Sequence, residues 1–213
     1  HPAQWEALRT FAGASAGDCG PLAVWSAGCA TGEEAWSLAI LLAEEGIPAR
    51  VLGTDVDDEA LSTARLASGY RDRSVGSLPP ALRERWLARA PDGWTVVRAA
   101  DLPVSFAGHN LARDPAPRSP AADGAWDLIL CRNVLLYFPE PVVRRVIALL
   151  LGALAPDGGL WLGPADLLPP DLSLAHADRW EGERYLRRGG PRRPSAPLPR
   201  VPLRGFLMAR HKA

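Results

Sequence analysis

Short apolar runs and helically spaced apolar residues follow one another along the first third of the chain. Residues 22–26 form an apolar run that predicts a buried strand, and residues 50–54 predict a second one. Between them, apolar residues recur at helical spacing from Glu33 until Gly46 and Pro48, which are typical helix stop signals. This alternation favours an α/β fold, in which crossover helices connect the strands of a parallel sheet.

Two further helices extend this pattern. Apolar residues within 5–11 have near-helical spacing ahead of the first strand. After the second strand, Asp57 or Asp58 can cap a helix that Gly69 ends. The apolar residues of that helix are expected to face inward: Ala60, Leu61, Ala64 and Leu66.

The middle of the chain breaks this rhythm. Residues 71–108 predict a short helix over "LPPALRERWLARA" and strands within "GWTVVRAA" and "LPVSFAGHN", which suggest a small antiparallel insertion. The alternation then resumes with a fully buried strand around residues 128–130 and a helix over 140–154. A "PDGG" turn and a strand in "LWLGPAD" are expected next.

We expect one domain over residues 1–187. The Pro/Arg-rich residues 188–202 are expected to form a loop or linker, and residues 203–213 are a candidate last strand. The chain starts at His1 instead of Met, which leads us to expect a segment upstream of it.

Composition narrows the function classes. A length of 213 residues with 47% hydrophobic content suits one domain with a sizeable core. Lys+Arg and Asp+Glu are equal at 24 each, so net charge indicates neither a nucleic acid nor an anionic membrane as partner. The longest apolar run, residues 146–156, is far shorter than the roughly 20 residues of a membrane span, so no membrane insertion is expected.

The three cysteines, Cys19, Cys29 and Cys131, are too few and too scattered for a disulfide framework. No C-x-x-C pair suggests zinc. A reducing cytoplasm is therefore the simplest compartment, and no bound metal is expected. We also expect a monomer. We interpret Cys131 as a small core residue and His109 as a surface residue, not as catalytic groups.

Four groups of small or polar residues stand at predicted strand ends, where α/β folds bind ligands. The first is "SAGCATGEE", in which Ala27 and Gly28 are small enough to let a ligand approach the backbone. It matches neither the P-loop nor the dinucleotide fingerprint, which argues against pyrophosphate. Glu33 and Glu34 suit a ligand with a cationic end or free hydroxyls, or they only complement the helix dipole.

The other three groups follow later strands. Asp55 can accept hydrogen bonds from both hydroxyls of a ribose, with helix capping as the alternative. Asn110 can contact the edge of an adenine ring, or it is a turn residue. Arg132 and Asn133 end the most buried strand and need partners from the protein or a ligand, and Tyr137 follows them.

Taken in order, six segments closely resemble the CheR-type chemotaxis receptor methyltransferases, which use S-adenosylmethionine (SAM): "VWSAGCATGEEAWSLAILL", "GTDVDDEALSTA", "SGYR", "HNL", "WDLILCRNVLLYF" and "LAPDGGLWLG". The resemblance covers about residues 21–163. It implies a Rossmann-like class I methyltransferase fold, with a mostly parallel central sheet flanked by helices and a small antiparallel β insertion. It also implies methylation of glutamate side chains on the cytoplasmic domain of chemoreceptors, giving glutamate methyl esters and S-adenosylhomocysteine (SAH).

The resemblance also implies roles for individual residues. Six match positions that line the cofactor site: Glu34, Asp55, Asn110, Leu111, Arg132 and Asn133. Tyr137 matches a position near the transferred methyl group, where it would orient the acceptor or the methyl; the alternative is an aromatic core residue. A glutamate of ordinary pKa, about 4.3, is already ionised at neutral pH. The transfer would therefore rest on positioning and desolvation instead of a strong base.

The chain departs from the family pattern in two places. The family's small N-terminal helical domain and its T-x-F-F-R segment, which carries an active-site arginine, are absent from this chain. The residues "GPAD", 163–166, stand where relatives have a Gly-His/Ser-Ser-Glu-like sequence. Two alternatives stay open, the first of them because of the missing arginine segment and the Pro/Arg-rich residues 188–202. One is a catalytically impaired module that binds the cofactor or a signalling partner, and the other is a methyltransferase that acts on a small molecule.

Overall fold

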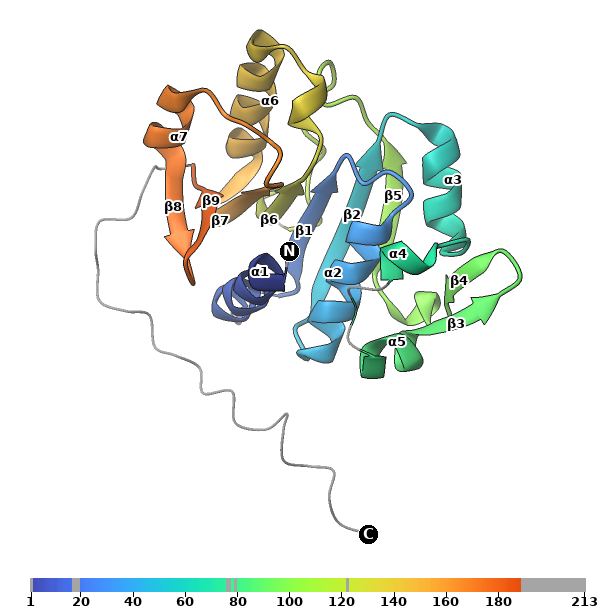
Figure 1. Ribbon diagram of the computed structural model, residues 1–213. Coiled ribbons are helices and arrows are strands. Elements are labelled where there is room, and N and C mark those ends of the chain that lie inside the picture. The colour runs from blue at the N-terminus through green and yellow to red at the C-terminus, as the bar shows by residue number, and fades with distance from the viewer. Residues whose placement is uncertain (1, 17–19, 76–77, 79, 122, 189–213) are drawn as a thin grey trace.

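One seven-stranded sheet organises the computed structural model, which describes residues 2–16, 20–75, 78, 80–121 and 123–188. Its strands are β1 (Leu22–Ala27), β2 (Ala49–Asp55), β5 (Val104–Gly108), β6 (Trp126–Cys131), β7 (Leu154–Leu162), β8 (Ala177–Trp180) and β9 (Glu183–Leu186). They lie in the order β5-β2-β1-β6-β7-β9-β8 (Figure 1). The first five in that order pair in parallel, whereas β9 is antiparallel to β7 and β8. The expected Rossmann-like arrangement is confirmed.

Helices cover both faces of the sheet. α1 (Pro2–Ser15) and α2 (Glu33–Glu44) lie on one face and α6 (Glu140–Ala153) on the other (Figure 1). Alternate residues of the central strands enter the two cores: Val24 and Leu128 pack with α1 and α2, and Trp25 and Ile129 pack with α6. Burial on both faces explains why these strands are continuous apolar runs in the sequence.

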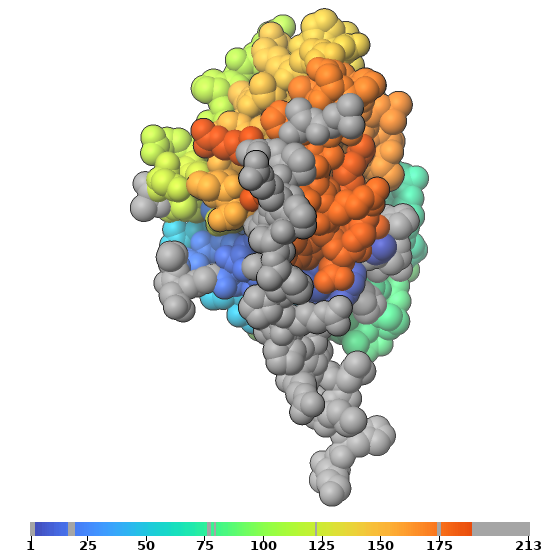
Figure 2. Space-filling model, turned by 90° about the vertical axis from the view of Figure 1, so that its left-hand side faces the viewer, coloured from blue at the N-terminus to red at the C-terminus, as the bar shows by residue number. Residues whose placement is uncertain are grey.

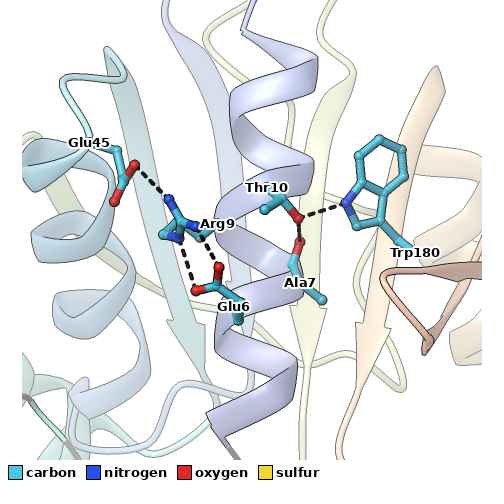
Figure 3. A network of polar contacts seen from close by, with 6 residues as sticks. All are labelled: Glu6, Ala7, Arg9, Thr10, Glu45 and Trp180. Carbon is cyan, nitrogen blue, oxygen red and sulfur yellow. Dashed lines mark hydrogen bonds and ion pairs between the residues drawn. The ribbon is translucent and has the colours of Figure 1, made fainter. Parts of the chain in front are cut away.

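The N-terminal helix α1 is held on two sides by side-chain bonds (Figure 3). Arg9 pairs with Glu6 in its own helix and, at 3.1 Å, with Glu45 just after α2. On the other side, the indole nitrogen of Trp180 in β8 donates to the Thr10 hydroxyl over 2.8 Å. These contacts fix α1 against the sheet and thereby place its first turn.

The antiparallel insertion is smaller than expected. It consists of the hairpin β3 (Leu87–Ala90) and β4 (Gly93–Val96), with the short helices α4 (Asp72–Val75) and α5 (Pro80–Trp86) before it and the 3-10 turn η1 (Ala99–Asp101) after it. The helix expected over "LPPALRERWLARA" ends at Trp86, because the following residues pair with β4 instead. The strand expected in "LPVSFAGHN" is β5, which joins the main sheet beside β2.

Three other expectations need correction. Leu66, expected to face inward, is 72% exposed, because it lies five residues beyond the inward-facing Leu61 in α3 (Asp58–Leu66). The left-handed Ala67 ends this helix and is buried in its place. The "PDGG" segment is not a separate turn but part of β7, which shifts register there against β6.

The C-terminal part of the sheet was not predicted. After β7 come the helix α7 (Pro170–His176) and the antiparallel strands β8 and β9, which close the edge of the sheet that Figure 2 faces. Apart from Arg188, the loop or linker expected over 188–202 and the strand expected over 203–213 lie outside the described residues. Among the residues that are described, none form a helix long and apolar enough to cross a membrane.

Candidate cofactor site

The turn after β1 is pinned to β2 and packed against the loop after β6. Ala27 is buried at the end of β1, and the backbone nitrogens of Gly28 and Cys29 donate to the Thr54 carbonyl over 2.8 and 2.9 Å. Gly28 has a φ of 78°, and a Cβ on it would lie 2.5 Å from the Val134 side chain. Glycine at this position is therefore required by backbone conformation and by packing within the protein.

Glu34 and Arg132 join the start of α2 to the end of β6. The Glu34 carboxylate accepts hydrogen bonds from the Ser26 hydroxyl at 2.7 Å and from the Arg132 guanidinium at 3.2 Å. Burial raises the pKa of Glu34 above its ordinary value, and the Arg132 charge and the Ser26 bond act against that rise. The guanidinium also lies 5.6 Å from the centre of the Trp5 ring in α1. The cation that was expected to need a partner thus finds two within the protein.

Asp55 bridges the first turn and the start of α3. Its carboxylate accepts from the backbone nitrogens of Ala30 at 2.8 Å and Asp57 at 3.0 Å. Asp57, in turn, caps α3 by accepting from the nitrogens of Glu59 and Ala60. The expectation that the cap is Asp57 or Asp58, and not Asp55, is confirmed. With two bonds made, the half-buried Asp55 carboxylate retains acceptor capacity for a ligand hydroxyl.

Asn110 organises its own turn after β5. Its side-chain oxygen accepts from the Ala112 nitrogen at 3.0 Å, and its backbone nitrogen donates to Asp114 at 2.7 Å. The next residue, Leu111, is buried in the core under α6. His109 is half-buried rather than at the surface, because its ring meets the Trp25 ring edge-on and its Nε2 lies 3.0 Å from the Pro115 carbonyl.

The loop after β6 is held by an aspartate that sequence reasoning missed. Asp166, 1% exposed, accepts hydrogen bonds from the backbone nitrogens of Asn133, Val134 and Leu135 at 2.5, 3.0 and 2.8 Å. A fourth comes from the Gly163 nitrogen at 2.9 Å. An acid that follows a buried strand, as in "GPAD", is the sequence signal that could have identified it.

Tyr137 ends the 3-10 turn η2 (Leu135–Tyr137) at the surface. It is 77% exposed, which excludes the alternative of an aromatic core residue. Cys131, by contrast, is fully buried, and burial raises the pKa of its thiol well above the ordinary value, so its interpretation as a core residue is confirmed. Burial likewise raises the pKa of Cys29 to about 12. Cys19 lies outside the described residues.

The structure therefore brings some of the predicted site residues into contact and leaves others apart. Glu34 contacts Arg132 directly, and Asp55 is joined to the first turn through Ala30. The side chain of Asn110 makes its bond within its own loop, and Tyr137 points away from the core. Sequence reasoning also missed Ser26 and Trp5, which complete the surroundings of the Glu34–Arg132 pair. Within the part of the chain that the structure describes, no cluster of side chains could hold a metal ion.

Comparison with known proteins places this geometry in a family. The sequence profile described as CheR methyltransferase, SAM binding domain, matches residues 1–178 of the chain. The chain belongs to this family. Its CheR methyltransferase domain has the Rossmann-like class I fold that the resemblance implied, with five parallel strands and an antiparallel C-terminal edge.

Individual relatives match different shares of the chain. The chemotaxis protein methyltransferase of Escherichia coli is 34% identical over 180 residues, which are 80% of this chain and 57% of the relative. The probable biofilm formation methyltransferase WspC of Pseudomonas putida is 33% identical over 186 residues, 85% of this chain and 42% of the relative. A solved SAM-dependent methyltransferase from Mesorhizobium loti is 20% identical with a TM-score of 0.42, covering 87% of this chain and 64% of that one. The chain spans about half the length of the curated relatives it matches.

SAM is the cofactor of this family's domain, and the chemistry of the strand ends fits it. SAM carries a sulfonium cation and a ribose. The only arginine at the end of β6, Arg132, is neutralised by Glu34, so it opposes a cationic ligand less than an unpaired arginine would. The remaining lone pairs of Asp55 can accept bonds from hydroxyls.

Proposed function

We propose that this domain transfers a methyl group from SAM to glutamate side chains on the cytoplasmic domain of chemoreceptors, as part of a chemosensory pathway in the cytoplasm. Support comes from the family match over residues 1–178 and from relatives named chemotaxis protein methyltransferase, such as the 34% identical protein of Escherichia coli. The observation that carries the proposal is the exposed Tyr137, only five residues after Arg132. It offers a phenol to an acceptor from outside. We further propose that a monomer acts and that its catalytic unit spans residues 1–187.

The proposal assigns roles to the residues at the strand ends. Asp55 binds the ribose hydroxyls, and Asn110 contacts the adenine edge beside Leu111. Glu34, Arg132 and Asn133 line the remainder of the cofactor site, and the turn at Ala27 and Gly28 forms its floor. Glu34 acts while paired, because its carboxylate already accepts bonds from Arg132 and Ser26.

When bound, SAM supplies an electrophilic methyl group on its sulfonium. The acceptor glutamate is ionised at neutral pH, so no residue of the chain has to remove a proton from it. What remains for the protein is alignment and exclusion of water. We assign the alignment of the acceptor carboxylate to the Tyr137 hydroxyl, which can donate one hydrogen bond.

The test is a transfer assay with methyl-labelled SAM and a purified chemoreceptor cytoplasmic domain, with base-labile label on glutamate as the expected product. For Tyr137→Phe, we expect kcat to fall about tenfold, equivalent to one hydrogen bond of ~1.4 kcal/mol, with SAH affinity kept. Tyr185→Phe is the matched control, because Tyr185 is buried in β9 and donates to the Asp178 carboxylate over 3.3 Å, so loss of its hydroxyl should affect stability instead of kcat. Equal losses of SAH affinity and turnover in Tyr137→Phe would mean that Tyr137 is structural.

A second candidate is a methyltransferase that serves biofilm formation. It is favoured by the 33% identity to the probable biofilm formation methyltransferase WspC, which extends over 85% of this chain. Both candidates use SAM, so phenotype separates them: deletion of the gene would impair chemotactic swimming under the first and biofilm growth under the second. Label recovered in a small metabolite instead of a protein would contradict both.

A further inference from the structure

Asp166 lies outside the turns that hold the predicted cofactor residues, yet it makes more backbone bonds than any of them. Its Oδ2 accepts from the nitrogens of Asn133 and Gly163, at 2.5 and 2.9 Å. Its Oδ1 accepts from those of Val134 and Leu135, at 3.0 and 2.8 Å. With 1% of the residue exposed, both oxygens face the protein, so the carboxylate has no open path to a substrate.

The bonds fix the conformation of the loop between β6 and η2. Three consecutive backbone nitrogens converge on one carboxylate, which fills the place that an N-cap side chain takes at a helix start. Val134, the actual cap residue of η2, makes no such side-chain bond. Asn133 sits in the left-handed region at a φ of 60°, which asparagine adopts more readily than most other residues besides glycine.

The loop 132–137 links residues of the proposed cofactor site to Tyr137, the residue proposed to align the acceptor. Arg132, at its start, pairs with Glu34, and Val134 packs on Gly28 in the first turn. Tyr137 ends the turn that begins at Leu135, whose nitrogen Asp166 holds. A shift of the loop therefore changes the position of Tyr137 relative to the cofactor residues. Misplacement by about 1 Å can cost about 100-fold in rate.

We propose that Asp166 is a positioning residue for methyl transfer, acting by holding the loop 132–137 in the one conformation that aligns Tyr137 with the cofactor site. The proposal rests on the proposed function for the role of Tyr137. It needs two carboxylate oxygens at this place, because each of them accepts two bonds. Asparagine keeps the size of the side chain but turns one oxygen into a donor that faces backbone donors.

The experiment compares Asp166→Asn, Asp166→Glu and the control Asp171→Asn, since Asp171 is exposed and its side chain bonds the exposed Arg144 and not the loop 132–137. Three readouts are measured: kcat and KM with the receptor domain, SAH affinity by calorimetry, and hydrogen exchange of the segment 132–138. For Asp166→Asn we expect kcat to fall about 100-fold, as for a misaligned acceptor, with a much smaller change in SAH affinity. Exchange should become faster in 132–138 only. Asp166→Glu should restore most of kcat, and Asp171→Asn should match the wild type.

Unchanged exchange in 132–138, or unchanged kcat, in Asp166→Asn would overturn the proposal. So would an Asp166→Glu variant that folds but is as slow as Asp166→Asn.

If Asp166→Asn speeds hydrogen exchange throughout the chain, the variant Gly163→Ala is used in its place. The added Cβ would lie 2.8 Å from both the Asn133 nitrogen and Asp166 Oδ2, displacing the loop while the carboxylate stays. Full turnover in that variant would contradict the proposal. If the wild type does not methylate the receptor, the proposed function fails, but exchange and SAH binding still test the loop without an acceptor.

Discussion

The two halves of the proposed cofactor site are built differently. At the ends of β1 and β6, Glu34 reaches Arg132 across 98 residues of sequence, and Asp166 holds the following loop from beyond β7. At the ends of β2 and β5, Asp55 and Asn110 each accept from the backbone nitrogen two residues ahead, and Asp55 also accepts from Ala30 in the first turn. The first half is fixed by buried charges from distant elements, whereas the second half is shaped mostly by its own turns. The first half should therefore govern stability as well as binding, and the second mainly binding.

Removing a charge from the first half is the strongest test of this difference. Arg132→Ala leaves the Glu34 carboxylate with the Ser26 bond but without its cation. Because the two side chains are only 15% and 16% exposed, we expect the free energy of unfolding to fall by about 3 kcal/mol, the lower end for an uncompensated buried charge. Urea unfolding followed by circular dichroism measures it.

Arg50→Ala is the matched control for that variant. Arg50 is exposed near the start of β2, at the opposite end of the sheet from the site. A surface substitution of this kind should change stability by less than about 0.5 kcal/mol. Equal stabilities of the Arg132 and Arg50 variants would remove the distinction between the two halves.

In the second half, Asp55→Ala should act on ligand affinity first. We expect SAH binding to weaken by about 1.5–3 kcal/mol, the loss of charge-assisted bonds to the ribose hydroxyls, as measured by calorimetric titration. The neighbouring Asp57→Ala gives the reverse pattern, since Asp57 only caps α3: a loss of about 1 kcal/mol in stability with SAH affinity kept. An Asp55→Ala variant with full affinity would rule out the ribose assignment.

The same division separates what sequence reasoning reached from what it missed. Asp57 as the cap of α3 follows from local rules, because its partners are two and three residues away. That Asp166 holds the β6 loop depends on β7 lying beside β6, which no local pattern specifies. The sequence indicated that Arg132 needs a partner, but only the structure shows that this partner is Glu34.

Prediction of the sheet from sequence was limited in the same way, since strand pairing depends on distant segments. Four of its five parallel strands, β1, β2, β6 and β7, were predicted as strands of the sheet, and burial on both faces leaves β1 and β6 as nearly continuous apolar runs. The antiparallel strands β8 and β9 were missed, because each is only four residues long and has a burial pattern that is mostly half-exposed or mixed. β5 was recognised as a strand but assigned to the insertion, since only its pairing with β2 reveals its place.

The smallest expected effect is a pH dependence from the first half. Burial raises the pKa of Glu34 above its ordinary value in the unfolded chain, so the folded protein holds this proton to higher pH than the unfolded chain does. The stability contributed by the protonated form is full below that value and is lost as pH rises through the folded pKa. Glu34→Gln removes this titration while keeping an oxygen that can accept from Arg132 and an amide nitrogen that can donate to the Ser26 hydroxyl. The free energy of unfolding of the variant, relative to wild type, should therefore increase with pH between the unfolded and the folded pKa of Glu34. Above this pH window it should level off.

Urea unfolding of both proteins from about pH 4 to about pH 8 measures this difference. The comparison between proteins with and without Glu34→Gln is more informative when both also carry Arg132→Ala. The guanidinium charge lowers the pKa of Glu34, so its removal should move the window to higher pH. Parallel stability profiles of wild type and Glu34→Gln would show that this carboxylate is solvated in the folded protein. In that case the half of the site at β1 and β6 would be no more fixed by buried charge than the half at β2 and β5.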